Sequence, residues 1–94
     1  MRFEWDIAKD TINRRKHGIG FRQAAEIFRG LIVATEDSRR DYGERRLIAL
    51  GEYGGDVIRV VFTKRGDGIR IISAWKANRN DRQSYEKARQ DRPV

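Results

Sequence analysis

Apolar and polar residues alternate near the start of the chain and then take on a helical spacing. Phe3 and Trp5 stand between charged neighbours, a pattern typical of a short edge strand or an extended segment. Asp6 is suited to cap a helix over residues 7–17, because its carboxylate can accept hydrogen bonds from the first free amides of a helix. Ile12 lies on the apolar side of this predicted helix, and we expect it to face the core.

A second helix is predicted over residues 21–29 by the clearest periodicity in the chain. Its apolar residues recur at positions i, i+3, i+4 and i+7, and they are Phe21, Ala24, Ala25 and Phe28. Gly20 gives this helix a weak N-cap, and Gly30 ends it.

The remaining sequence predicts a meander of strands followed by one helix. Strand-forming runs cover residues 31–35, 44–53, 56–64 and 69–75, and glycine-rich turns at 54–55 and 66–68 join the last three. A final helix is predicted over 79–89 with Asn78 as its cap, and residues 92–94 are expected to form a tail. The expected fold is a single α+β domain over residues 1–94. In it, two N-terminal helices pack on a mainly antiparallel sheet of four to five strands, and a C-terminal helix follows.

Composition limits the kinds of site that such a domain can carry. The 94 residues are 38% hydrophobic and 37% charged, which allows one modest core under a heavily solvated surface. With no cysteine and one histidine, we expect no disulfide, no metal site and no cofactor. No apolar run approaches the roughly 18 residues of a membrane span, and the first residues form no apolar signal region. We therefore expect a cytoplasmic protein without a membrane partner.

Positive charge is concentrated in the C-terminal part of the chain. Residues 57–94 carry ten Lys and Arg against four Asp and Glu, a net charge of +6, whereas residues 1–56 carry eleven against ten. Arg59 and Arg70 interrupt apolar strands where a pure core strand would not carry arginine. A basic field of this kind attracts phosphate groups, so RNA is the first candidate ligand.

Short motifs in a fixed order carry a resemblance to a known family. They are Phe3-Glu4-Trp5-Asp6, Lys16-His17-Gly18, Phe21 with Ala24, Arg65-Gly66-Asp67, Ile69-Arg70-Ile71-Ile72-Ser73-Ala74, and Arg79 with Arg82 and Tyr85. Together they resemble the BrnT toxins of BrnT/BrnA type II toxin–antitoxin systems over nearly the whole chain. Two departures stand out, because Gly20 replaces a better helix cap and Trp75-Lys76 replaces a more arginine-rich pair.

The resemblance implies a RelE-like fold and a ribonuclease activity that blocks translation. The substrate would be RNA, including ribosome-associated mRNA. The resemblance also implies a BrnA-like antitoxin with a ribbon-helix-helix DNA-binding domain, and a hetero-oligomer of toxin and antitoxin.

Metal-independent RNA cleavage requires a base, an acid and a cation that stabilises the phosphorane. Arginine suits the last role because it is always charged and binds phosphate oxygens bidentately. We expect Arg65, Arg70 and Arg79 to converge on the scissile phosphate, with Arg65 and Arg70 brought together by a hairpin. The alternative for each is a solvated surface arginine.

Three further residues are candidates for proton transfer, each with a structural alternative. Histidine is the side-chain type whose unperturbed pKa lies near neutrality, so His17 can act as base or acid, but its place beside Gly18 favours a role at the helix C-terminus. Glu44 is an alternative base, or one half of an ion pair at a strand start. Tyr85 can donate a proton or stack on a base, or it can pack the last helix on the core.

A second set of residues is expected to bind RNA without taking part in the chemistry. These are Arg45, Arg59, Lys76 and Arg82, together with Trp75 as a stacking platform for a base. The leading hypothesis is a small metal-independent endoribonuclease toxin. Two alternatives stay open: a non-catalytic, basic nucleic-acid-binding module, and a protein-interaction domain whose basic face docks an acidic partner.

Overall fold

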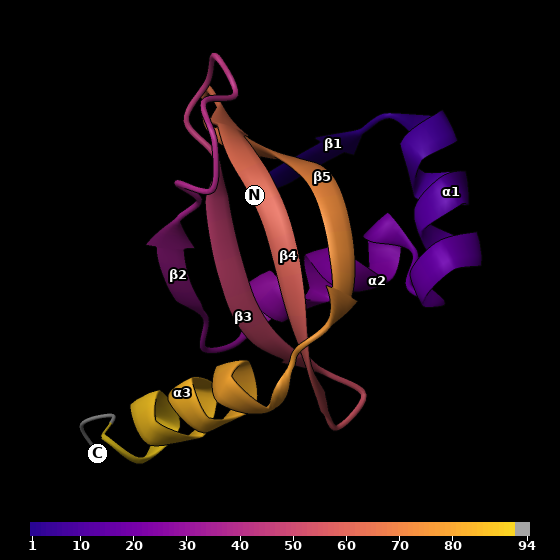
Figure 1. Ribbon diagram of the computed structural model, residues 1–94. Helices are drawn as coiled ribbons and strands as arrows, with labels where there is room; N and C mark the ends of the chain where they lie inside the picture. The colour runs from indigo at the N-terminus through magenta and orange to yellow at the C-terminus, as the bar shows by residue number, and fades with distance from the viewer. Residues whose placement is uncertain (92–94) are drawn as a thin grey trace.

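A five-stranded sheet with three α-helices forms the part of the chain that the structure describes, residues 1–91 (Figure 1). The structure is a computed structural model. The elements in chain order are β1 (Arg2–Trp5), α1 (Ile7–His17), α2 (Phe21–Ala25), the 3₁₀ turn η1 (Glu26–Arg29), β2 (Val33–Glu36), β3 (Leu47–Tyr53), β4 (Asp56–Arg65), β5 (Gly68–Lys76) and α3 (Arg79–Gln90). The tail predicted at 92–94 lies outside the described residues.

The strand order is β1-β5-β4-β3-β2. The predicted meander is confirmed, because β2, β3, β4 and β5 pair antiparallel with their neighbours. The N-terminal strand β1, however, pairs with β5 in parallel, so the sheet is mixed. Its register sets Phe3 beside Ile69 and Trp5 beside Ile71.

Two glycine turns close the hairpins of this meander. Gly54 and Gly55 both have positive φ, 59° and 86°, as a type I′ turn requires at its two central positions. Gly66 has a φ of 60° in the β4–β5 turn. An L-residue with a Cβ would be strained at each of these positions, so glycine fixes where the strands reverse.

The two faces of the sheet differ in what covers them. Ile58, Val60 and Phe62 belong to the core, together with Phe21 and Ile27 of the helical layer, which lies behind the sheet in Figure 1. Successive side chains of a strand point to opposite faces, so the intervening β4 residues Arg59, Val61, Thr63 and Arg65 lie on the other side. We call that side the open face. Arg59 therefore lies opposite the N-terminal helices, as expected, but its side chain is only 19% exposed and pairs with Asp81.

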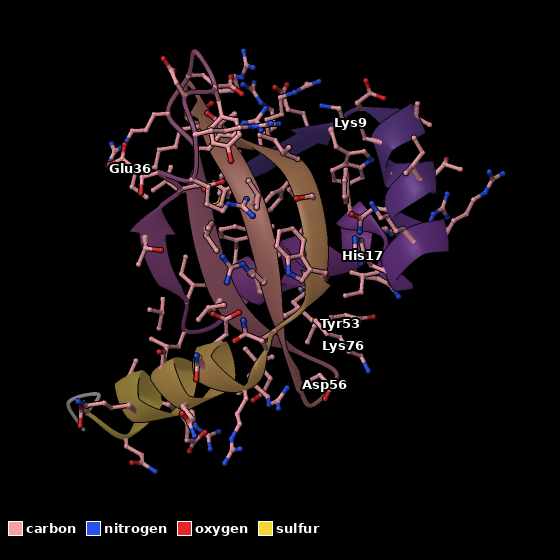
Figure 2. The ribbon with its side chains drawn as sticks, in the orientation of Figure 1. Lys9, His17, Glu36, Tyr53, Asp56 and Lys76 are labelled. Atoms are coloured by element: carbon pink, nitrogen blue, oxygen red, sulfur yellow. The ribbon has the colours of Figure 1, made fainter. Side chains whose placement is uncertain are left out.

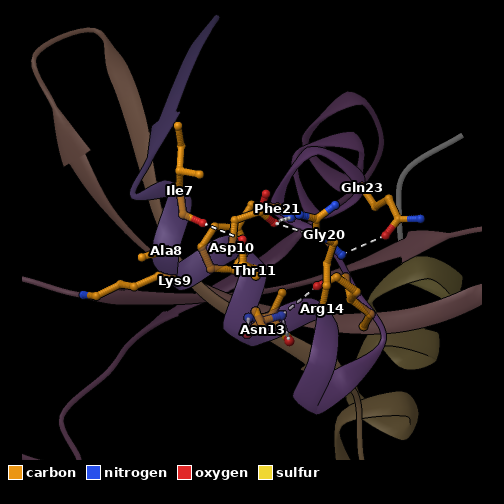
Figure 3. Close-up of polar contacts among 12 residues, drawn as sticks. Ile7, Ala8, Lys9, Asp10, Thr11, Asn13, Arg14, Gly20, Phe21 and Gln23 are labelled. Carbon is orange, nitrogen blue, oxygen red and sulfur yellow. Dashed lines mark hydrogen bonds and ion pairs between the residues drawn. The ribbon is translucent and has the colours of Figure 1, made fainter.

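The first helix packs differently from the prediction. Ile12 is 59% exposed, and the buried residue of α1 is Asn13. The reason is that α1 lies against β5, where β1 pairs only as far as Ile71 and leaves the following edge open. Asn13 fills this edge: its amide nitrogen donates to the carbonyls of Ala74 (2.7 Å) and Ile19 (2.8 Å), and its oxygen accepts from the Ala74 amide (3.2 Å). Figure 3 labels Asn13 on α1 and marks its polar contacts.

The second helix is shorter than predicted and is capped by α1. Residues 21–25 are α-helical and the next four form the 3₁₀ turn η1, which tightens the end of the helix. Gly20 has no side chain to offer, so Asp10 of α1 accepts from the Phe21 amide at 2.8 Å (Figure 3). Gln23 in turn accepts from the Gly20 amide at 2.8 Å. Asp10 therefore ties the start of α2 to α1.

Candidate functional site

Charged and aromatic side chains gather at two places on the open face. One place is the end of the sheet at the β4–β5 turn, and the other lies near the end of β5, where Figure 2 labels Lys76. Strand register decides which residues share the face: Arg70 lies opposite Thr63, and Trp75 lies opposite Arg59.

The Glu44 cluster, which comprises Glu44, Arg46, Arg65 and Arg70, lies at the β4–β5 turn. Arg65 Nη2 donates to Glu44 Oε1 at 3.3 Å, and Arg46 Nε donates to Glu44 Oε2 at 3.2 Å. The predicted strand over residues 44–53 begins only at Leu47, because residues 44–46 leave the ladder and Thr63 Oγ1 donates to the Arg45 carbonyl at 2.7 Å. A cavity of about 320 Å³ adjoins Glu44 and Arg65.

Arg70 lies next to this group on the adjacent strand, as expected from the hairpin that connects it to Arg65. Its cross-strand neighbour Thr63 is two residues from Arg65, so the two arginines are diagonal neighbours on the open face. Arg70 Nη1 lies 3.6 Å from Glu4 Oε1 of β1. About half of the Arg65 side chain and a third of the Arg70 side chain are exposed, so both can reach a ligand.

The Trp75 cluster, which comprises Trp75, Arg59, Arg39 and His17, lies further along the same face. The guanidinium carbons of Arg59 and Arg39 lie 5.6 Å and 5.9 Å from the Trp75 ring centre, within the range of a cation–π interaction. The His17 ring centre is 5.9 Å from that of Trp75. Two hydrogen bonds to Asp81, of 3.0 and 2.9 Å, hold Arg59 in place.

Arg39 is a site residue that the sequence did not predict. It lies in the loop between β2 and β3, where no periodicity marks an inward-facing residue. The Asp37 side chain is fully buried and accepts from Arg39 Nε and Nη2, both at 2.8 Å. These hydrogen bonds hold the pKa of Asp37 well below its usual range, although burial opposes them, and they raise the pKa of Arg39. Asp37 therefore presents Arg39 to Trp75 as a fixed cation.

The distance between the two clusters limits what they can do together. Arg59 and Arg65 are six residues apart in one strand, which places their Cα atoms roughly 20 Å apart. His17 and Glu44 belong to different clusters, so they do not form an acid–base pair on one phosphate. The Glu44 cluster offers a carboxylate among guanidinium groups, and the Trp75 cluster offers an aromatic ring among cations.

The predicted convergence of three arginines is wrong for Arg79. This residue begins α3, and α3 follows β5 at the end of the sheet away from Arg65 and Arg70. Figure 1 shows α3 running outward below the sheet instead of folding back over it. Arg79 therefore cannot grip the same phosphate as Arg65 and Arg70.

Other predicted residues also lie apart from the two clusters. Tyr85 is buried, and its hydroxyl donates to the Leu31 carbonyl at 3.0 Å, which supports the packing alternative. Arg82 donates to the Ala77 carbonyl at 3.0 Å, and Lys76 ends β5 on the same side of the molecule as α3. Arg45, by contrast, lines the same cavity as Glu44 and Arg65, and its guanidinium lies 3.6 Å from Glu36.

Residues 1–91 contain neither a cluster of metal ligands nor a helix suited to a membrane. No three His, Asp or Glu side chains in this part of the chain gather as metal ligands would. No helix within the same residues is long and apolar enough to cross a membrane.

Comparison with known proteins adds one match. The family model described as ribonuclease toxin, BrnT, of type II toxin-antitoxin system matches residues 5–81, which include the last residue of β1, all of β2 to β5 and both clusters. No curated protein matches the chain.

Proposed function

Because the chain belongs to the BrnT family of ribonuclease toxins of type II toxin–antitoxin systems, we propose that it is a metal-independent endoribonuclease whose open face binds and cleaves RNA. Cleavage of mRNA, including mRNA on the ribosome, would inhibit translation in the cytoplasm. A BrnA-like antitoxin would neutralise it in a hetero-oligomer. The order of helices, sheet and terminal helix supports a RelE-like domain.

The Glu44 cluster supplies the groups that the chemistry needs. Glu44 takes the proton of a ribose 2′-hydroxyl, and the 2′-oxygen then attacks the adjacent phosphorus. Arg65 and Arg70 bind the non-bridging oxygens as negative charge develops on them. The bond to the 5′-oxygen breaks, and this oxygen takes a proton from water at the half-exposed site. The products are a 2′,3′-cyclic phosphate and a 5′-hydroxyl.

The Trp75 cluster holds the substrate strand further along the face. An unpaired base stacks on Trp75, and Arg39 and Arg59 attract the neighbouring phosphates. His17 contacts Trp75 at the end of α1 and belongs to a different cluster from Glu44, so it does not serve as the catalytic acid. Because base stacking of this kind needs a free base face, the substrate is single-stranded RNA.

The observation that carries the proposal is the Glu44 carboxylate within 3.3 Å of both Arg65 and Arg46, beside Arg70 on the open face. The test is the rate of RNA cleavage in EDTA by the wild type and by Glu44→Gln and Arg70→Gln. Each variant should lose about 10²- to 10⁴-fold in rate, the range for a catalytic group. Arg89→Gln, near the end of α3 and outside both clusters, should keep the wild-type rate.

Two outcomes of this experiment would contradict the proposal. A folded Glu44→Gln protein with the wild-type rate would remove Glu44 as the base. RNA binding without any cleavage by the wild type would favour the non-catalytic nucleic-acid-binding module instead. Thermal unfolding of each variant establishes that a lost rate is not a lost fold.

A further inference from the structure

A groove lies on the helix-covered side of the sheet, at the outer edge of β1. Its volume is about 520 Å³, and its floor is formed by Phe3, Trp5 and Phe28. These side chains are only half-buried, although the Phe3 and Phe28 rings contact each other with centres 5.5 Å apart. Met1, at the groove, is 82% exposed. The groove thus presents apolar surface that the described chain does not cover.

The strand that borders the groove is open to a further strand. β1 is the outermost strand, paired with β5 on one side, and no strand of residues 1–91 pairs with its other side. Phe3 and Trp5 alternate in β1, so both rings point to the groove side of the sheet. A protein segment added to β1 would pair with its free backbone groups and place alternate side chains over these rings.

The charge at the groove selects for an acidic occupant. Arg22 and Arg29 line it and are both exposed, whereas Glu26 is its one acidic lining residue. Glu26 lies 3.5 Å from Arg29, but the Arg29 side chain is 83% exposed, so this ion pair is weak. Arg22 has no carboxylate partner among the described ion pairs. RNA would use the arginines, but it cannot pair with a strand edge.

We propose that this β1 groove docks the antitoxin through an extended, acidic segment with apolar side chains that adds to β1. The inference rests on the proposed function, because the partner is the antitoxin of the type II system. The groove lies on the opposite side of the sheet from the two clusters, so docking there anchors the antitoxin without using the residues that bind or cleave RNA.

Charge reversal at Arg22 and Arg29, which line the groove, tests this docking surface. Arg22→Glu with Arg29→Glu should weaken binding of the purified cognate antitoxin at least tenfold in calorimetry. The same variant should cleave RNA at the wild-type rate in the absence of antitoxin. The control is Lys9→Glu with Arg15→Glu, which makes the same charge change on the exposed surface of α1 and should leave both properties unchanged.

Amide hydrogen exchange of the wild-type complex provides the second measurement. Amides of residues 2–5 should gain protection when the antitoxin binds. Wild-type antitoxin affinity in the Arg22→Glu, Arg29→Glu variant, or unchanged exchange in β1, would overturn the inference. So would loss of RNA binding in that variant, because the groove would then be part of the RNA surface. A wild-type chain that binds antitoxin through the groove but cleaves no RNA would refute the proposed function alone.

Discussion

Replacement of Asn13 by alanine is expected to unfold the chain more readily than any change on the exposed side of α1. Asn13 is 6% exposed and is the only described side chain that hydrogen-bonds to the backbone of β5 from α1. Asn13 also donates a hydrogen bond to the carbonyl of Ile19, in the segment that leads into α2. Because α1 ends at His17, loss of this anchor would also release His17 from Trp75.

The magnitude follows from the groups that alanine would leave without partners. Ala74 is fully buried, so its N–H and C=O would lose their partner away from water, at about 1–3 kcal/mol for each group. Alanine regains about 0.5 kcal/mol of helix propensity over asparagine. Water that enters the space left by the amide would hydrogen-bond to some of the backbone groups that lost their partner, and so reduce the loss of stability. We expect a net loss of about 2–4 kcal/mol, a large fraction of the 5–15 kcal/mol typical of a domain.

Urea denaturation followed by circular dichroism measures this loss. Asn13→Asp sharpens the test, because a carboxylate still accepts from the Ala74 amide but faces two carbonyls that it cannot bind; it should destabilise at least as much as alanine. Lys9→Ala, on the exposed side of α1, should shift the free energy of unfolding by no more than about 0.5 kcal/mol. An Asn13→Ala protein as stable as Lys9→Ala would refute the anchoring role.

Three further predictions concern packing, acid stability and salt. Gly51→Ala places a Cβ 2.5 Å from the Ile27 Cβ and should destabilise by about 1–3 kcal/mol in the same urea titration, whereas Gly30→Ala, with no atom within 4 Å, should not. The pKa of Asp37 is lower in the folded protein than in the unfolded chain. The ionised carboxylate therefore stabilises the fold fully above the pKa of the unfolded chain, and this stabilisation is lost as the pH falls through the pKa of the folded protein. The wild type should therefore lose stability between pH 5 and pH 2 more steeply than Asp37→Asn, by at most about 1.4 kcal/mol per pH unit; equal slopes would contradict this. RNA affinity should fall linearly in log–log form as salt rises from about 50 mM to 0.5 M, and a flat response would mean that phosphate neutralisation does not drive binding.

Local signals in the sequence predicted most of the elements, because their causes lie within a few residues. Asp6 caps α1 by accepting from the Ala8 and Lys9 amides, as its position before the helix predicted. Gly54-Gly55 predicted a hairpin because both residues must take positive φ. Asn78 caps α3 in the same way, accepting from the Asp81 amide at 2.8 Å.

Features that depend on distant contacts could not be predicted in this way. The parallel pairing of β1 joins residues 2–5 to residues 68–71, and nothing local specifies the direction. Asn13 resembles a surface residue in sequence, since only the open edge of β5 explains its burial. Ile12 was expected in the core because periodicity identifies the apolar side of a helix but not whether another element covers it.

In the candidate site, too, the residues set by local structure were predicted and those set by distant contacts were not. Arg65, Arg70 and Glu44 come together because a hairpin turn and the adjoining strand entry fix their spacing. Arg79 does not join them, because the direction of α3 is set by distant packing that includes the contact of Tyr85 with Leu31. Arg39 was missed, because its contact with Trp75 joins the loop before β3 to β5, which lies two strands from β3 in the sheet.

Amide chemical-shift mapping of isotope-labelled Glu44→Gln protein with a short single-stranded RNA tests most directly that RNA is bound on the open face. The account predicts shifts that concentrate at Arg59, Arg65, Arg70 and Trp75 and in the loop that carries Arg39. Shifts confined to α2, η1 and the outer edge of β1, with none on the open face, would contradict it.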